Sequence, residues 1–184
     1  MRYNATTGEQ EALLYEEKHP KYVEPQNPIT FLPWDETKFI YQSQKDGYNH
    51  LYLFDLANGM MHPIETEGPN KLFIPQQQIT KGEWLVQRIL GFNEKTKEVI
   101  IMSTEISPLQ SNAFAVNLKT GKTRLIGANE GVHRVQLSGS GKYVIDSYSS
   151  HNVARNIEIL PVSGKGRSHN LLTATHPMEA YNMP

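Results

Sequence analysis

The chain has 184 residues, 38% of them hydrophobic, and a formal net charge of −1 at pH 7. This length suits one globular domain or a piece of a larger one, and the composition argues against disorder and collagen-like repetition. The balanced charge argues against nucleic acid as a partner, and the lack of cysteine excludes a disulfide scaffold, a thiol nucleophile and a cysteine-based zinc site.

The N-terminus, residues 1–8, reads MRYNATTG, so a turn-like segment follows the first methionine almost at once. It lacks the apolar stretch of a signal peptide, and no window of the chain approaches the roughly 18 apolar residues of a membrane span. We therefore expect a piece cut from a longer protein, with no membrane span.

Short apolar runs recur along the chain, and Gly, Pro, Asn or Asp closes each of them. The runs are rich in β-branched and aromatic residues, and no long stripe of helical period competes with them. The clearest runs are 29–32, 38–43, 50–55, 84–92, 99–103, 113–118, 133–137, 143–148 and 156–160. This pattern predicts an all-β fold.

A turn motif also repeats, with Asn or Asp four residues before a glycine. It occurs at residues 4–8, 55–59, 117–121 and, in a looser form, 160–164. A serine lies near the end of the second strand of each unit, at Ser43, Ser103 and Ser147. A repeat of about 40 to 60 residues with four short strands is typical of a β-propeller blade.

We therefore predict one partial β-propeller domain over residues 1–184. It would hold three four-stranded antiparallel blades, and the last hairpin of a preceding blade would lie at about residues 1–17. The three blades would lie at about 29–66, 79–127 and 132–173, with residues 67–78 as an inserted loop. Open blade faces at both ends would favour self-association into a homo-oligomer.

Residues 137–142, LSGSGK, resemble a phosphate-binding loop but do not match its motif. Gln136 and Tyr143 stand where that motif needs glycine and a hydroxyl residue, so a hairpin turn is the better interpretation. Ser140 lies between glycines only in this turn and not in a nucleophile elbow. We therefore assign no catalytic residue.

The seven histidines are scattered, and none is paired at the spacing of a helical zinc site. They lie at positions 19, 50, 62, 133, 151, 169 and 176. We predict no metal site and no cofactor. Asp146 lies within an apolar strand, where a buried structural hydrogen bond is favoured over catalysis.

Two segments near the N-terminus could contact a ligand. Glu16 and Glu17 are adjacent carboxylates, but neighbouring side chains on a strand point to opposite faces, so exposure to solvent is favoured. Residues 22–28 form an extended stretch bounded by prolines. This stretch is either a linker between blades or a lining of the funnel of a propeller.

Two segments carry a family resemblance, residues 39–52, FIYQSQKDGYNHLY, and residues 79–86, ITKGEWLV. They resemble the N-terminal propeller of the dipeptidyl peptidase IV family. Segments 99–105, 131–134 and 137–149 are similar to its next two blades, and residues 181–184 are similar to the approach to its hydrolase domain. The resemblance therefore covers nearly the whole chain in the order of the family.

The resemblance implies the last blades of an eight-bladed propeller on a prolyl-type serine exopeptidase. The catalytic Ser, Asp and His of that family would lie in an α/β-hydrolase domain after Pro184. The family's paired glutamates belong to an earlier blade, so their role is not carried over to Glu16 and Glu17. The resemblance places Tyr22, Glu24 and Gln26 against the substrate cavity.

The resemblance also implies partners and a location. The partners would be the downstream hydrolase domain and peptides with Pro or Ala in second position, and a bacterial parent would be periplasmic or secreted. The alternative is a stand-alone WD40-like periplasmic module that binds a protein partner. The segments 46–52 and 82–84 favour the peptidase, and a Gly-x-Ser-x-Gly encoded downstream would discriminate between the two.

Overall fold

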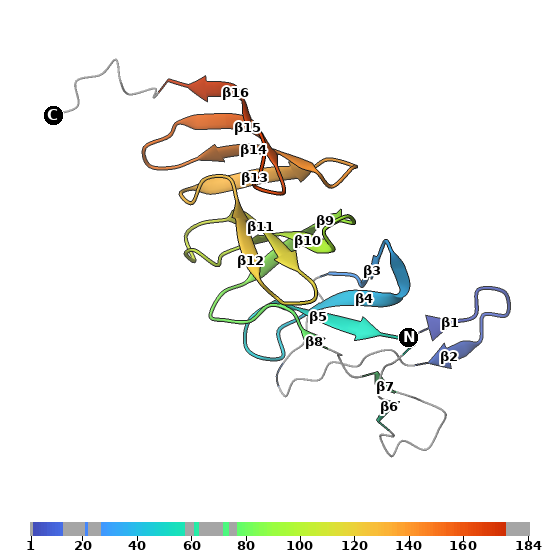
Figure 1. Ribbon diagram of the computed structural model, residues 1–184. Helices are drawn as coiled ribbons and strands as arrows, with labels where there is room; N and C mark the ends of the chain where they lie inside the picture. The colour runs from blue at the N-terminus through green and yellow to red at the C-terminus, as the bar shows by residue number, and fades with distance from the viewer. Residues whose placement is uncertain are drawn as a thin grey trace. The chain divides into compact units, whose positions relative to one another are not determined.

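The computed structural model describes residues 2–12, 21, 27–57, 61–62, 72–73 and 77–175, and the regular elements among them are all β-strands (Figure 1). They form three four-stranded and two two-stranded sheets, all antiparallel. The all-β, blade-type prediction is therefore confirmed. The described part of the chain contains no helix that is long and apolar enough to cross a membrane. The chain divides into two compact units, residues 1–81 and 82–184.

The first unit contains one four-stranded sheet, in the order β3-β4-β5-β8, and two short hairpins. The sheet consists of β3 (Thr30–Leu32), β4 (Asp35–Ser43), β5 (His50–Asp55) and β8 (Gln77–Gln78). The hairpins pair β1 (Arg2–Tyr3) with β2 (Gln10–Ala12) and β6 (Met61–His62) with β7 (Leu72–Phe73).

Aromatic side chains form the core of this sheet. Phe39 on β4 and Phe54 on β5 are cross-strand partners, and their rings are stacked with centroids 4.8 Å apart. Tyr52 joins them, and all three side chains are buried. Such cross-strand aromatic pairs stabilise a sheet beyond the apolar area that they bury.

The outer strand of the first sheet differs from the prediction. Residues 67–78 were expected to form a loop after the blade at about 29–66, but β8 lies within those residues and pairs with β5. The position of β8 is explained by Ile79 and Thr80, which follow it and are buried. Ile79 donates its amide to the Leu51 carbonyl at 2.8 Å, and Thr80 Oγ1 accepts from the Leu51 amide at 3.0 Å. The sheet thus extends past the predicted blade limit at residue 66.

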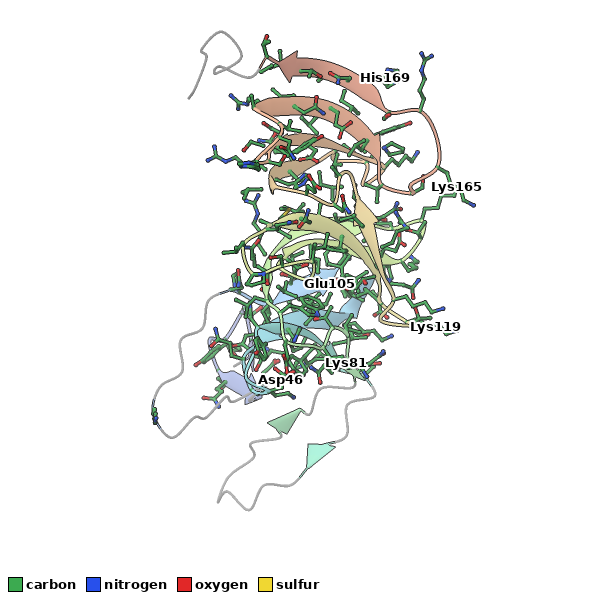
Figure 2. The ribbon with its side chains drawn as sticks, turned by 90° about the vertical axis from the view of Figure 1, so that its left-hand side faces the viewer. Asp46, Lys81, Glu105, Lys119, Lys165 and His169 are labelled. Atoms are coloured by element: carbon green, nitrogen blue, oxygen red, sulfur yellow. The ribbon has the colours of Figure 1, made fainter. Side chains whose placement is uncertain are left out.

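The second unit contains two four-stranded meanders in which each strand pairs with the next. The first consists of β9 (Val86–Asn93), β10 (Glu98–Ser103), β11 (Asn112–Asn117) and β12 (Thr123–Ile126). The second consists of β13 (Val132–Leu137), β14 (Tyr143–Ser149), β15 (Arg155–Pro161) and β16 (His169–Ala174). Lys119 and Lys165, in the turns that follow β11 and β15, lie at the same edge of this unit (Figure 2).

The two meanders of the second unit pack face to face (Figure 1). Their shared core is one apolar cluster. It consists of Ile100, Met102, Ala113, Ala115 and Ile126 from the first meander and Val135, Val144 and Val162 from the second. Ser111 extends the contact, because its carbonyl accepts from the His133 amide at 2.9 Å. Each meander therefore buries one face against its neighbour.

The repeated turn motif has the same hydrogen bonds at residues 4–8 and 117–121, whereas in the looser turn at 160–164 the Gly164 amide donates to the Pro161 carbonyl at 3.0 Å. Asn4 Oδ1 accepts from the amides two and three residues further on, at 2.9 and 3.0 Å, and the Gly8 amide donates to the Asn4 carbonyl at 2.9 Å. Asn117 Oδ1 accepts in the same way, at 3.0 Å in both cases, and the Gly121 amide donates to the Asn117 carbonyl at 2.8 Å. The sequence repeat is therefore a structural repeat. A single propeller domain over residues 1–184 stays a prediction.

The β13–β14 hairpin offers a test of this packing. Gly141 has a φ of 66°, and a Cβ there would overlap the carbonyl oxygen of Phe92 on β9. The left-handed conformation alone costs a residue with a side chain roughly 1–2 kcal/mol. We expect Gly141→Ala to lower the free energy of unfolding by about 2 kcal/mol or more in urea titrations.

The matched control lies in the same turn. Gly139 has no heavy atom within 4 Å of the position that its Cβ would take. Gly139→Ala should therefore leave the urea midpoint nearly unchanged. Equal effects of the two substitutions would contradict the close approach of this hairpin to β9.

Candidate functional site

The residues proposed to contact substrate lie outside the described part of the chain. These residues are Tyr22, Glu24 and Gln26, and the adjacent pair Glu16 and Glu17 also lies outside it. Their assignments therefore stay predictions.

The glycine-rich segment 137–142 forms the expected hairpin turn between β13 and β14. The Gly141 amide donates to the Ser138 carbonyl at 2.9 Å, and the Ser140 hydroxyl lies 3.1 Å from the Ser138 hydroxyl. Ser140 is therefore bonded within its own turn. This supports a structural role for the segment.

The structure brings together a histidine and an aspartate that lie 13 positions apart. His133 on β13 and Asp146 on β14 point to the same face, because side chains alternate along each strand and the two strands pair in a hairpin. Their Nδ1 and Oδ2 atoms are 2.7 Å apart, and both side chains are 0% exposed. Asp146 thus has the buried structural hydrogen bond that its position in the sequence suggested.

The surroundings of the His133 ring define its charge. Nδ1 faces the Asp146 carboxylate, and Nε2 lies 3.1 Å from the Glu130 carbonyl oxygen, which can only accept. The ring can donate to both acceptors only when both nitrogens carry a proton. Tyr148 stacks on the ring at 4.7 Å with an angle of 16° between the planes. The geometry therefore favours an imidazolium in a buried ion pair.

A second carboxylate faces this pair. Glu158 on β15 is the cross-strand partner of Asp146. Burial raises the pKa of Glu158, the negative charge of Asp146 raises it further, and His133 lowers it. Burial also raises the pKa of the Tyr148 hydroxyl, and the charges of Glu158 and Asp146 add to that shift.

The neighbouring meander closes over the same cluster. A Cβ at Gly127, directly after β12, would lie 2.9 Å from Asp146 Oδ2 and 3.0 Å from Leu160 Cδ1. The glycine therefore lets the backbone come close to the ion pair. Asp146 Oδ1 is buried and has no hydrogen-bond partner among the described residues. The ion pair is thus covered by protein from both meanders.

This cluster acts in packing and not in chemistry. A general base must come within hydrogen-bond reach of a substrate, and both side chains of the pair are fully buried. Among the described residues, no group of three or more His, Asp or Glu side chains is placed so that it could hold a metal ion. The sequence analysis did not find His133 as the partner of Asp146, although strand alternation and the hairpin were available as signals.

The opposite face of the β13–β16 sheet carries a pocket of about 310 Å³. Its lining consists of Val132, Arg134, Ser147, Tyr148, Ser149, Ala154 and Arg155. The sequence analysis missed both arginines, because the third strand of the sheet is needed to bring Arg155 beside the other two strands.

Comparison with known proteins identifies the family. The model of the dipeptidyl peptidase IV N-terminal region matches residues 1–155. The chain belongs to this family. The family resemblance carried by the sequence motifs is therefore confirmed.

Solved structures show the same relationship. The chain aligns over 99% of its length, with 45% identity and a TM-score of 0.78, with a protein assigned as a dipeptidyl aminopeptidase IV from Bacteroides ovatus, and covers 26% of that protein. It also aligns over 74% of its length, with 26% identity and a TM-score of 0.58, with dipeptidyl peptidase 4 of Porphyromonas gingivalis, and covers 17% of it.

Fungal relatives are similar over a shorter part. The probable dipeptidyl peptidase 4 of Aspergillus fumigatus is 30% identical over 120 residues, which are 64% of this chain and 14% of that protein. Dipeptidyl peptidase 4 of Arthroderma otae is 26% identical over 148 residues, which are 77% of this chain and 17% of that protein. The chain thus spans only a small part of the length of these relatives.

The buried ion pair offers a test by a double-mutant cycle. Asp146→Ala removes the counterion of His133 and leaves its charge buried, which costs about 3–5 kcal/mol when one partner of such a pair is lost. We expect Asp146→Ala to lower the free energy of unfolding by about 3 kcal/mol in urea titrations. The cycle with His133→Ala should show a coupling energy.

Glu130→Ala is the control, because it retains the backbone carbonyl that faces His133 Nε2. It should leave the free energy of unfolding almost unchanged. Additive effects of the Asp146 and His133 substitutions would contradict a direct interaction between these side chains.

Glu158 offers a test of the pH dependence of stability. Its pKa in the folded chain is raised above the ordinary value of 4.5, so the stability that it contributes is fully present below that pH and is lost as the pH rises through the folded pKa. Glutamine imitates the protonated carboxyl group. Glu158→Gln should therefore match the wild type near pH 4 and gain relative stability by pH 7, as measured by urea titrations at several pH values.

Glu83→Gln, at an exposed position, serves as the control for the loss of one carboxylate. A relative stability of Glu158→Gln that falls between pH 4 and pH 7 would contradict the assigned direction.

Proposed function

We propose that the chain is a non-catalytic propeller segment of a dipeptidyl peptidase IV-like serine exopeptidase, where it gates substrate access and supports the hydrolase domain. The observation that carries this proposal is the match of residues 1–155 to the N-terminal region of that family. The three four-stranded antiparallel meanders support it, because such sheets are the units of propellers.

The chemistry of peptide hydrolysis is the reason why the proposal assigns catalysis to another domain. Attack on a peptide bond needs an activated nucleophile, a base within hydrogen-bond reach and donors for the oxyanion. In our proposal the hydrolase domain of the longer protein supplies these groups. The intact protein would release dipeptides from peptide N-termini with Pro or Ala in second position.

Blades that restrict the access of substrate have to be rigid. In the second unit, side-chain contacts hold the two sheets together. Arg124 on β12 donates to the Val162 carbonyl, which follows β15, and pairs with Glu98 on β10 at 3.2 Å. This side chain ties the two meanders together, as the shared apolar cluster does on their facing surfaces. Blades held in this way would admit a thin peptide end and exclude a folded chain.

Further parts of the proposal concern the substrate side and the location. Tyr22, Glu24 and Gln26 would face the substrate cavity of the intact protein. A bacterial parent would be periplasmic or secreted. The hydrolase domain would be the principal partner of this segment.

An activity assay distinguishes this segment from the longer protein that would contain it. We expect the 184-residue chain alone to hydrolyse no Gly-Pro chromogenic substrate and to take up no fluorophosphonate label. The same chain extended through the encoded downstream domain should do both. The measurement is chromogenic turnover together with in-gel detection of the label.

A variant of the extended protein without the serine of the downstream nucleophile motif is the control and should be inactive. Turnover by the segment alone that survives repurification, and that is lost on replacement of one of its own serines, would overturn the proposal. An extended protein with no activity would favour the stand-alone interaction module.

A further inference from the structure

The lysines of the second unit gather in the turns at one end of its two sheets. Four turns connect paired strands at this end, at residues 94–97, 118–122, 138–142 and 162–168. They contain six lysines and one arginine, all exposed, and a single acidic residue, Glu94. We call these four turns the basic edge, and Figure 2 shows Lys119 and Lys165 on it.

The four turns of the basic edge are in contact with one another. In the first meander, the Leu118 amide donates to the Lys97 carbonyl at 3.3 Å. In the second meander, the Val162 amide donates to the Lys142 carbonyl at 2.9 Å. The Arg124 guanidinium joins the two meanders here, because it donates to the Val162 carbonyl. The basic edge is therefore one continuous surface and not four separate loops.

The positive charge of the basic edge is not balanced by nearby carboxylates. Among the residues that the structure describes, no ion pair involves Lys95, Lys119, Lys122 or Lys165. The connections at the opposite end of the unit contain three glutamates and no lysine or arginine; they are residues 82–85, 104–111, 127–131 and 150–154. The net charge of −1 for the whole chain thus hides an uneven distribution.

The basic edge would stay uncovered in an intact propeller, a step that rests on the function proposed above. Neighbouring blades pack through the faces of their sheets and leave the turns at the strand ends free. In the proposed function Tyr22, Glu24 and Gln26, in the connection that leads into β3, face the substrate. The corresponding connections into β9 and β13, residues 82–85 and 127–131, lie at the end opposite the basic edge. The basic edge would therefore face away from the hydrolase domain.

The composition of the basic edge indicates the kind of partner. Lysine is a compact point charge that suits diffuse attraction, whereas a site for one phosphate or carboxylate favours the fork of arginine. The cations spread over the turns of two sheets, which suits a flat anionic surface better than a linear polyanion. The large apolar residues of the turns, Leu118 and Val162, are buried, so nothing apolar is offered for insertion into a bilayer.

We propose that the basic edge binds the surface of a membrane that contains anionic phospholipids. Lysines near such a surface are attracted by its negative potential, and their contributions accumulate. The contact is peripheral and electrostatic. It would hold the propeller against a membrane with its substrate side turned away.

The test is cosedimentation of the 184-residue chain, and of the chain extended through the downstream domain, with lipid vesicles. We expect both proteins to bind vesicles of phosphatidylglycerol and phosphatidylcholine but not vesicles of phosphatidylcholine alone. Raising the salt from about 0.05 M to about 0.5 M should abolish binding, because salt screens the attraction. The quadruple variant Lys95→Gln/Lys119→Gln/Lys122→Gln/Lys165→Gln should bind at least about tenfold more weakly.

The matched control removes the same number of exposed cations outside the basic edge. It is the quadruple variant Lys81→Gln/Arg88→Gln/Arg134→Gln/Arg155→Gln, which has the same net charge as the first variant. It should bind the vesicles as the wild type does. Far-UV circular dichroism shows whether each variant is folded, and the single variant Lys119→Gln, with a smaller expected loss, provides a second measurement.

Three results would overturn the proposal. The first is equal binding to vesicles of phosphatidylcholine alone, which would indicate adhesion of apolar surface. The second is an equal loss of binding in the two quadruple variants, which would indicate an effect of net charge alone. The third is binding of heparin through the basic edge without binding to phosphatidylglycerol vesicles, which would indicate a linear polyanion.

The extended protein separates this proposal from the proposed function. An extended protein that hydrolyses the Gly-Pro substrate but does not bind phosphatidylglycerol vesicles would overturn the membrane contact alone. An extended protein without activity, whose 184-residue segment still binds the vesicles through the basic edge, would overturn the proposed function alone.

Discussion

The face-to-face packing of neighbouring sheets is the constraint on which the second unit depends. A four-stranded meander satisfies its inner backbone hydrogen bonds by itself, but it cannot bury either of its faces without another layer. Here the β9–β12 and β13–β16 sheets supply that layer to each other through one shared apolar cluster. The close approaches at Gly127 and Gly141 are consequences of this packing, because a side chain at either position would separate the sheets.

The same packing explains why a charged pair lies at a place where apolar residues would suffice. Once the two sheets close, His133 and Asp146 lose all contact with water, so each is tolerable only as the partner of the other. The Glu130 carbonyl and the ring of Tyr148 complete the surroundings of the imidazolium. An ion pair of this kind favours one register of β13 on β14, because a slip of β13 by one residue would turn His133 to the outer face and leave Asp146 buried without its partner.

The two faces of the last sheet thus have opposite properties. The inner face holds its charges in pairs, whereas the outer face presents Arg134 and Arg155 beside exposed apolar residues. The paired inner charges and the exposed outer residues belong to one sheet, separated by the alternation of side chains along β13 and β14.

The sequence by itself determined the strands and the turns, because both depend on local chemistry. The alternation of apolar residues in a strand can be recognised without knowing which strand pairs with it. The turns at Asn4 and Asn117 are closed by hydrogen bonds within five residues. The family followed from the order of these segments along nearly the whole chain. For the same reason the hairpin at residues 137–142 and the buried place of Asp146 were predictable.

Only the tertiary structure decided which strand completes the first sheet and which side chains meet. β8, within residues expected to form a loop, completes the first sheet because Ile79 and Thr80 are buried against β5, and burial depends on residues distant in sequence. The register of β13 on β14 likewise decides the pairing of His133 with Asp146. The pocket beside Arg134 and Arg155 requires the register of three strands, β13, β14 and β15. Periodicity shows which face a side chain occupies on its own strand, but the contacts between strands are set by packing.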